Sequence, residues 1–275
     1  MKKYSILSIM ATLSLLTGCQ ENGLLLPEQE LVVVRAFLFA GEPVTEIQLK
    51  TTYPITSDET DGGPINDASV SLLRNGTTYP LVASPGDSGY YHYPGADLQV
   101  NVGDEFELLV EHNGKEIRAT TAIPAEPEAI AISHSIYTIE TPVFNGSPVI
   151  FDTSQVKVSW EAEDDAYYFI VVENTETTLT YIDERLGEVL KFLRTFRSRP
   201  VQDREYIIRR FDLTYLGNHE VRVYRVNQEY ADLYAFGLQD SRSLNEPKSN
   251  IENGLGVFAG FSSSMVELFV NKSEN

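Results

Sequence analysis

Ser88 lies in a stretch that resembles a catalytic nucleophile motif, Gly86-Asp87-Ser88-Gly89. A serine nucleophile requires a histidine base and an acid that orients the base. No histidine precedes this stretch, since the first in the chain is His92. Two tyrosines follow where the protease motif continues with a glycine and a proline. We therefore interpret the tetrapeptide as a tight turn that leads into a tyrosine-rich strand.

The other groups that could bind a metal or transfer a proton are four histidines and two acidic stretches. The histidines are scattered and share no ligand spacing, so we expect structural or solvent-facing roles for them. The acidic stretches lack the spacing of an EF-hand loop and indicate surface loops, with weak Ca²⁺ binding as the alternative. Paired carboxylates could also serve glycoside hydrolysis, but no pair is singled out by its surroundings. No metal or cofactor is predicted. These residues are His92, His112, His134, His219, Asp58–Gly63 and Glu161–Asp165.

Composition narrows the classes of function further. The chain has 275 residues, and 42% of them are apolar, which is enough to build a packed core. The formal net charge of -19 argues against nucleic acid as a partner, because neutralising phosphates requires a basic face. A single cysteine excludes an internal disulfide and a cysteine-based zinc site. The length permits one large domain or two ordinary ones.

The N-terminus carries the most specific signal in the chain. Two lysines are followed by an apolar run, Ile6–Leu16, which is too short to span a bilayer but suits a signal peptide. The run ends in Leu16-Thr17-Gly18-Cys19, which resembles the lipobox of bacterial lipoproteins. We expect residues 1–18 to be removed as a signal peptide, Cys19 to be lipidated, and residues 19–29 to form a tether. The partner predicted by this signal is the membrane, through the lipid on Cys19.

The first part of the body reads as β-structure. Apolar and polar residues alternate with a period of two in several segments, which is typical of half-buried strands. Two of these segments flank Asn75-Gly76 and two flank Asn113-Gly114. Asn-Gly between alternating runs is a strong hairpin signal, because both turn residues must adopt positive φ. Residues 30–123 are therefore predicted to form an immunoglobulin-like β-sandwich.

The stiff segment Ile123–Pro127 marks the predicted domain boundary. Beyond it, the strand that ends in Trp160 and the next with Tyr167 and Tyr168 are similar to the opening of a fibronectin type III domain. Helical spacing over residues 182–196, and again near residues 230–238, predicts one or two inserted helices. The fold class is thus mainly β, with two tandem sandwiches. The second would span residues 128–275, and its closing strands would lie at residues 255–258 and 266–270.

Two groups of side chains are candidates for binding a partner. Ten of the lysines and arginines lie between residues 185 and 225, and among them Arg194, Arg197 and Arg199 follow the first predicted helix. They could form a docking face, or an ordinary solvated surface with local ion pairs. Tyr91 and Tyr93 share one face of a strand and could present aromatic rings to a partner. Ordinary packing within the sheet is the alternative for both tyrosines.

The order of these features resembles the Bacteroidetes lipoprotein family of domain of unknown function 4249. The resemblance covers nearly all of the chain after the lipobox, and the C-terminal block Gly254–Phe258 with Gly260 is its most specific part. It implies an outer-membrane lipoprotein, often encoded near TonB-dependent transporters, and supplies no catalytic residues. Its matching stretches are Leu31–Val34, Ala68–Leu72, Gly89-Tyr90, Gly103–Val110, Ala119–Pro124, Trp160, Tyr167-Tyr168 and Ser249–Gly260.

We therefore expect a non-enzymatic, lipid-anchored protein of the outer membrane, on either its outer or its periplasmic side. It would act as a binding or scaffolding accessory, beside a TonB-dependent β-barrel transporter, in nutrient capture or envelope assembly. An adhesin or subunit of a surface appendage is one alternative. A hydrolase with its site at the domain junction is another. The sequence leaves the ligand, whether small molecule or glycan, open.

Overall fold

The computed structural model describes residues 31–52, 62–139, 155–184, 193–235 and 248–273, and these are mainly β-strand. The predicted lipidation site Cys19 and the tether lie outside the described residues. The described elements are β1 (Val32–Phe39), β2 (Glu46–Thr51), β3 (Ser69–Arg74), β4 (Thr77–Ala83), β5 (Tyr90–His92), β6 (Glu105–His112), β7 (Lys115–Ala122), β8 (Glu128–Ile132), β9 (Ile136–Ile139), β10 (Val156–Glu161), β11 (Tyr167–Asn174), β12 (Thr195–Arg197), β13 (Glu205–Ile208), the 3₁₀ turn η2 (Arg210–Asp212), β14 (Gly217–Val226), α3 (Gln228–Ala235), β15 (Ile251–Glu252) and β16 (Leu255–Lys272).

The two Asn-Gly hairpins form as predicted. Asn75 and Gly76 have φ of 51° and 78°, and they join β3 to β4. Asn113 and Gly114 have φ of 51° and 72°, and they join β6 to β7. Positive φ at both turn residues matches the right-handed twist of the flanking strands. The turn residues therefore set the register that directs every second side chain of these strands inward.

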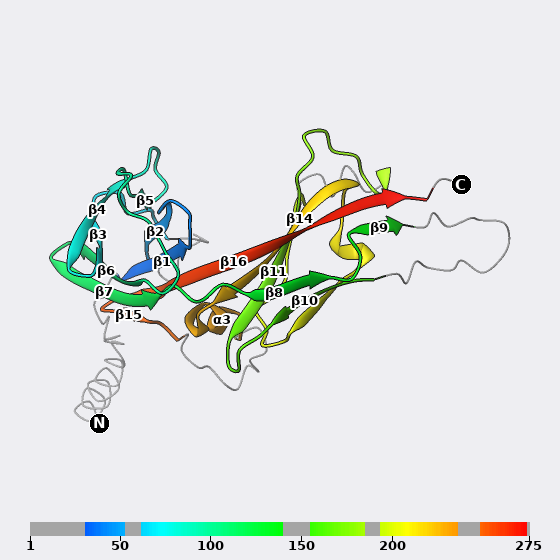
Figure 1. The fold of residues 1–275 in the computed structure, drawn as a ribbon. Helices are drawn as coiled ribbons and strands as arrows, with labels where there is room; N and C mark the ends of the chain where they lie inside the picture. The colour runs from blue at the N-terminus through cyan, green and yellow to red at the C-terminus, as the bar shows by residue number, and fades with distance from the viewer. Residues whose placement is uncertain (1–30, 53–61, 140–154, 185–192, 236–247, 274–275) are drawn as a thin grey trace, which may run out of the picture.

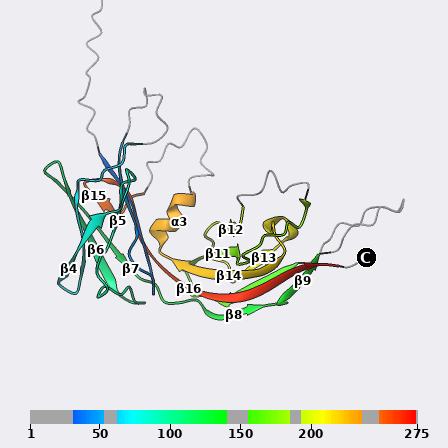
Figure 2. The ribbon, with the colours of Figure 1, turned by 90° about the horizontal axis from the view of Figure 1, so that it is seen from above.

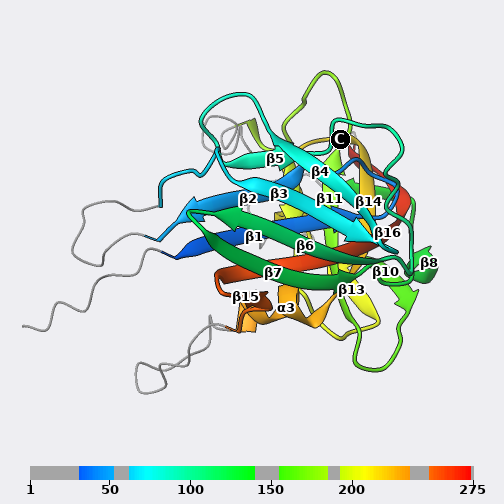
Figure 3. The same cartoon turned by 90° about the vertical axis from the view of Figure 1, so that its left-hand side faces the viewer.

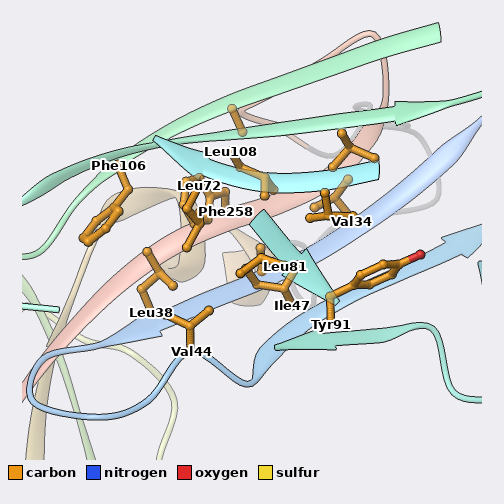
Figure 4. Close-up of a cluster of buried hydrophobic side chains, with 14 of the residues drawn as sticks. Val34, Leu38, Val44, Ile47, Leu72, Leu81, Tyr91, Phe106, Leu108 and Phe258 are labelled. Atoms are coloured by element: carbon orange, nitrogen blue, oxygen red, sulfur yellow. The ribbon is translucent and has the colours of Figure 1, made fainter. Parts of the chain in front are cut away.

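The first sandwich buries one face of each of its strands. Its sheet runs in the order β16-β1-β2-β5-β4-β3-β6-β7-β15 and curls around a single core. Figure 3 shows β3, β4, β6 and β7 lying side by side across this unit. In Figure 4, side chains from opposite walls meet in the core, including Val34, Leu72, Leu108 and Phe258. Phe258 belongs to β16, so the last strand of the chain completes the first core.

The second sandwich packs two sheets against each other. One has the strand order β12-β11-β14-β16, with β9 also paired to β16, and the other has the order β13-β10-β8. Between them, Trp160 lies 5.6 Å from Tyr168, measured between ring centroids, and only 5% of Trp160 is exposed. The buried tryptophan on β10 is the feature expected from the resemblance to a fibronectin type III opening. The mainly β, sandwich-type fold is confirmed.

The long strand β16 is shared by both sandwiches. It pairs in parallel with β1 from Leu255 to Phe261, and antiparallel with β14 from Phe261 to Val270. Figure 1 shows it as one continuous arrow that runs from one unit into the other. The two closing strands expected from the sequence are thus one strand. The domain boundary at residue 123 stays a prediction. The pairing of β16 with β1 adds residues 255–261 to the first sandwich.

Two asparagine side chains link β7 to β16, where the first sheet comes close to closing on itself. The Asn250 amide nitrogen donates to the carbonyl oxygens of Thr120 (3.2 Å) and Phe258 (2.7 Å), and its oxygen accepts from the Phe258 N–H (2.9 Å). Asn227 similarly donates to the carbonyl of Ala122 (3.0 Å), and its oxygen accepts from the N–H of Gly260 (3.0 Å). The amides thus bridge backbone groups of two strands that do not pair directly.

Replacing Asn250 with alanine is expected to lower the free energy of unfolding by about 1–3 kcal/mol, because three hydrogen bonds to the backbone are lost, two of them half-buried at Phe258. Urea unfolding followed by circular dichroism would measure the change. Asn101→Ala is the matched control, since Asn101 is exposed and its amide donates only over longer distances, 3.3 Å to Asp104 and 3.4 Å to the Gln99 carbonyl. Equal losses in both variants would contradict a linking role for Asn250.

The helix predictions had mixed outcomes. The later helix is confirmed as α3, Gln228–Ala235. The earlier one, predicted over residues 182–196, is wrong at its C-terminal end, because Thr195–Arg197 form the edge strand β12. Residues 185–192 lie outside the described residues. Pairing with β11 and packing of Phe196 against the second core override the local helical spacing here. No helix among the described residues is long and apolar enough to cross a membrane.

Candidate binding surface at the junction of the two sandwiches

The strands at the junction carry apolar side chains on both faces. On β1, Val34, Ala36 and Leu38 enter the first core, while the alternate residues Phe37 and Phe39 point the opposite way. There they meet residues from β11, β14, α3 and β16 in a third buried cluster. Seen from above (Figure 2), α3 lies in the angle between the two sandwiches. We call this group the junction cluster; its aromatic members are Phe37, Phe39, Tyr167, Phe169, Tyr224, Tyr230, Tyr234 and Phe261.

Ring stacking fixes the geometry of the junction cluster. Phe169 and Tyr224 are stacked, with centroids 4.9 Å apart and planes 7° from parallel. Phe39 stacks on Phe261 at 4.6 Å, and Phe37 meets the edge of Phe261 at 5.4 Å. Such pairs add about 0.5–1.5 kcal/mol each beyond the area that they bury. The cluster is therefore a rigid aromatic layer beneath the side chains that cover it.

Two exposed arginines lie over this aromatic layer. The Arg197 guanidinium lies 5.0 Å from the centroid of Phe169 and donates from Nη1 to the Tyr230 hydroxyl at 3.2 Å. The Arg35 guanidinium lies 5.3 Å from the centroid of Phe37. Cation–π contacts of this kind contribute about 0.5–2 kcal/mol and hold the planar group in one orientation.

The Tyr230 hydroxyl below Arg197 remains protonated at neutral pH. Burial raises the pKa of Tyr230, and its hydrogen bond with Tyr234 raises it further, while the nearby charges of Arg197 and Arg35 partly oppose the rise. The two hydroxyl oxygens are 3.0 Å apart. Tyr230 accepts from Arg197, and either phenol can be the donor in its bond with Tyr234. Arg197 is thus held by the neutral phenol of Tyr230 rather than by a carboxylate.

The exposed side of the second sandwich continues this surface as three rungs of paired residues. The aromatic rung is Phe169, Tyr224 and Ser263; the arginine rung is Arg197, Val171, Arg222 and Met265; the glutamate rung is Thr195, Glu173, Glu220 and Glu267. Within the rungs, Arg222 forms an ion pair with Glu220 and donates to Ser263 Oγ at 3.3 Å. Successive rungs are two residues apart, or about 6.6 Å along the strands.

The structure places the sequence-predicted partner residues in different settings. Arg197 belongs to the surface just described. Arg194 donates to the backbone carbonyls of Asn174 (2.6 Å) and Glu176 (2.7 Å), and Arg199 is exposed nearby on the chain after β12. Their role in binding stays a prediction.

Tyr91 requires a correction, because it is only 1% exposed and lies in the first core. Its hydroxyl donates to the Ile65 carbonyl (3.1 Å) and accepts from the Ala68 N–H (3.0 Å), so its ring is not available to a partner. Tyr93 is half-buried and donates to Asp97 at 2.7 Å, also outside the junction. The predicted alternation of this short strand is correct, but its tyrosine face is the core face.

Sequence reasoning missed Arg35 and Tyr230. A usable signal exists for β1, since Val32–Phe39 is apolar at nearly every position, which indicates a strand buried on both faces. Arg35 is the exception within that run and therefore marks where the second face reaches solvent. No comparable local signal marks Tyr230, because it joins the cluster only through the packing of α3.

The other residues that could act in catalysis or bind a metal do not come together in one site. Ser88 is in a turn between Gly86 and Gly89, both with positive φ, and His92 bonds to Ser84 rather than to Ser88. Among the described residues, no group of three or more His, Cys, Asp or Glu side chains is arranged to hold a metal ion. The acidic stretch Asp58–Gly63 lies mostly outside the described residues, while Glu163 is an ion-pair partner of Arg225 at 2.6 Å.

His219 is the one histidine in a buried setting, and only 4% of it is exposed. Nδ1 lies 3.0 Å from the Gly217 carbonyl oxygen and Nε2 lies 3.3 Å from the Asn174 amide nitrogen. A carbonyl can only accept, so Nδ1 carries the proton and Nε2 accepts from the amide. Burial lowers the pKa of His219, and the bond to Gly217 offsets this only in part.

Acidification is therefore expected to destabilise the fold through His219. Its pKa is lower in the folded than in the unfolded chain, so the unfolded state binds the proton first as the pH falls below about 6.5. Urea unfolding at pH 7.5 and 5.5 would measure the loss. His219→Gln should reduce the pH dependence, whereas the matched control His134→Gln, at an exposed position, should retain it. Identical profiles for wild type and His219→Gln would contradict this assignment.

Comparisons with known proteins place the chain in a family. The family model described as a domain of unknown function (DUF4249) matches residues 22–267. No curated protein matches the sequence. Among solved structures, a chain of a cytokine receptor complex aligns at 14% identity over 70% of this chain and 89% of that one, with a TM-score of 0.21. Titin domains A168–A170 align at 10% identity over 71% and 60%, with a TM-score of 0.20. These scores are too low to support an argument, but the family match spans most of the sequence: the chain belongs to the DUF4249 family.

Proposed function

We propose that this protein is a non-enzymatic lipoprotein of the outer membrane that binds or scaffolds beside a TonB-dependent transporter. The observation that carries the proposal is the arginine-covered junction cluster, which presents charged and aromatic groups in the angle between two joined sandwiches. Rigid aromatic surfaces with a few oriented polar groups are typical of recognition sites. The lipobox at Cys19 and membership of the DUF4249 family supply the cellular setting of the proposal.

The packing of the junction favours binding over hydrolysis. A glycosidase requires two carboxylates facing each other across a space for substrate. At this junction, among the described residues, the space is filled by Phe169 and Phe261, each 1% exposed. The glutamates of the glutamate rung lie side by side on an open sheet face instead. The surface is therefore suited to hold a ligand rather than to enclose a reacting bond.

The position of the lipobox suits a tethered body. Eleven residues separate Cys19 from Leu31, the first described residue. An extended chain spans at most about 3.6 Å per residue, so the tether would reach about 40 Å. Leu31 is fixed to the first sandwich by a 3.1 Å hydrogen bond from its N–H to Thr52 Oγ1. The junction surface could thus lie well clear of the lipid and face a neighbouring membrane protein.

The anchor can be tested with Cys19→Ala in the native cells. We expect the variant to retain its leader, to carry no acyl chains by mass spectrometry, and to be lost from the outer-membrane fraction. Gln20→Ala is the matched control and should be processed and retained. An unmodified Cys19 thiol in the wild-type protein, with the first methionine still attached, would overturn the anchor.

The accessory role needs a second measurement. In-cell crosslinking followed by purification of the wild-type protein should recover an outer-membrane β-barrel, and the Cys19→Ala variant should not. Wild-type protein that is lipidated and yet crosslinks to no β-barrel would refute the transporter partnership while leaving the anchor intact.

A further inference from the structure

The smaller sheet of the second sandwich ends at β13, which pairs with β10 alone among the described strands. The N–H of Trp160 donates to the carbonyl of Arg204 at 3.0 Å, so residue 204 faces β10. Because backbone groups alternate in direction along an antiparallel strand, those of Glu205 and Ile207 face away from β10. Within the described residues, no hydrogen bond reaches these outward N–H and carbonyl groups. Four backbone groups therefore form an open edge.

This edge is accessible along its length. A groove of about 410 Å³ runs beside it and is lined by residues of β13 and its immediate neighbours: Asp203, Arg204, Glu205, Tyr206, Ile207 and Arg209. The open stretch stops at Arg209, whose backbone is still extended. Its N–H, the next one to face outward, donates to the Asp212 carboxylate at 2.8 Å. The chain thus satisfies that group itself and leaves Glu205 and Ile207 available.

The opposite edge of the same sheet, β8, is protected where β13 is not. The pairing of β8 with β10 shifts register between Ser159 and Glu161, and Ala129 within β8 has a φ of 50°. The chain before β8 is also tied to β16, since Ser264 Oγ donates to the Pro127 carbonyl at 3.0 Å. Irregular backbone and covering elements are devices that prevent edge-to-edge pairing. The regular edge of β13 carries neither device and is suited to accept a further strand.

The edge is complementary to a second copy of itself in one register. In an antiparallel pair, outward-facing residues must meet outward-facing residues, so the registers nearest the middle of the strand are centred on Glu205, Tyr206 or Ile207. Centring on Glu205 places two like charges opposite each other, which is unfavourable. Centring on Ile207 requires the N–H of Arg209, which Asp212 already accepts. The register centred on Tyr206 has neither fault.

That register satisfies all four open groups. Glu205 lies opposite Ile207 of the second copy, and the two-fold axis repeats the pair, so four backbone hydrogen bonds form. The same register places Asp203 opposite Arg209 of the second copy, again twice. Both side chains are exposed, and neither has an ion-pair partner among the residues that the structure describes. Two-fold pairing would supply one to each.

We propose that two copies of this protein associate through β13, which joins their smaller sheets into one continuous sheet about a two-fold axis. Such an interface is self-complementary, as closed dimers require. The paired stretch is short, so the association is weak between free molecules. Anchoring both copies in one membrane would raise their effective concentration and favour it. This inference goes beyond the proposed function, because the pairing depends only on the edge of β13.

A cysteine at position 206 tests the pairing. In the proposed dimer, residue 206 meets its own copy at a non-hydrogen-bonded position, where Cα atoms lie about 4.5 Å apart, within reach of a disulfide. Native membranes that contain the full-length Tyr206→Cys variant are treated with a mild oxidant. We expect a dimer on a non-reducing gel that disappears on reduction. The wild-type protein, whose only cysteine is Cys19, is the blank and should give no dimer.

Cysteines on either side of position 206 test the register. Glu205→Cys and Ile207→Cys should each give little dimer alone, because neither position meets its own copy. When the two variants carry different tags and are expressed together, they should crosslink to each other, since these positions are opposite. This pair also decides the matter if Tyr206→Cys fails to fold, because Tyr206 is half-buried and its ring lies 6.0 Å from that of Phe196.

Charge reversal tests the predicted ion pairs. Sedimentation of the purified full-length protein in detergent gives the Kd of the dimer. Asp203→Arg should raise this Kd about tenfold, because two attractive pairs become repulsive ones. Adding Arg209→Asp to the same chain should restore it. Glu46→Arg is the matched control, because it makes the same change of charge at an exposed position of the first sandwich.

Three results would overturn the inference. One is the absence of a dimer from both Tyr206→Cys and the co-expressed pair. Another is a dimer of equal yield from Glu205→Cys or Ile207→Cys alone. The third is a disulfide from position 206 to a different protein instead of to a second copy. The same measurements on concentrated Cys19→Ala protein separate this inference from the proposed function. Loss of the lipid or of the β-barrel partner would count against that function and leave the β13 pairing intact.

Discussion

Gly256→Ala is expected to destabilise the protein by about 3 kcal/mol or more. Gly256 has φ of 115°, a region that side-chain-bearing residues rarely adopt. A Cβ atom there would overlap the backbone carbonyl of Val34, its partner in the parallel pairing of β1 with β16. Neither strand can move aside, since Val34 is also paired to Leu49 of β2. The added methyl must therefore separate β16 from the first sandwich.

Thermal and urea unfolding of purified Gly256→Ala would measure this loss. Gly41→Ala is the matched control, because Gly41 also has a positive φ, 77°, but no atom lies within 4 Å of the position that a Cβ atom would take there. It should cost about 1 kcal/mol, which is the conformational term without the overlap. Similar costs at both positions would show that β16 does not approach β1 as closely as described.

Phe261→Ala is the second change with a large expected effect, about 3–5 kcal/mol, which is typical of a fully buried phenylalanine. Phe261 is 1% exposed and contacts rings of β1, β11 and α3: Phe37 and Phe39, Phe169, and Tyr230. It lies where β16 passes from the first sandwich to the second. The resulting cavity would therefore loosen both units, and hydrogen exchange should rise in β1 and β11 together.

Phe269→Ala provides the comparison on the same strand and the same face. Phe269 is 40% exposed, so its removal should cost less than about 1 kcal/mol and leave exchange in β1 unchanged. If Phe261→Ala accelerated exchange in only one of the two sandwiches, the junction cluster would not couple them. Arg35 and Arg197 would then not lie over one continuous packed cluster.

The elements that can be predicted from the sequence are those whose signals are local. Asn-Gly turns and period-two alternation place the hairpins of the first sandwich, because turn geometry and side-chain alternation are both determined within a few residues. The run ending in Trp160 and the helix at Gln228–Ala235 are found for the same reason. The C-terminal glycine block points to the family, and Gly256 and Gly260 prove to lie where β16 passes close to other backbone atoms.

Features set by distant contacts could not be predicted in this way. Thr195–Arg197 has helical spacing with the preceding residues but pairs as an edge strand with β11. Tyr91 and Tyr93 alternate correctly, yet alternation alone does not show which face is the core. The arginine surface depends on residues from β1, β12 and α3, which are far apart in sequence. Of these residues, the sequence pattern singles out only Arg197. It does so because of the positive charge, not because of the Phe169 ring that Arg197 covers.

The shared strand has a consequence for how the molecule is made. The ribosome releases β8 to β14 and α3 before it releases residues 251–261, which the first sandwich needs to complete its wall. The first sandwich therefore lacks the strands that pair with β1 and β7 until synthesis is nearly complete. A premature stop shortly before residue 250 would leave neither half complete, so even small C-terminal truncations should act as complete losses of the protein.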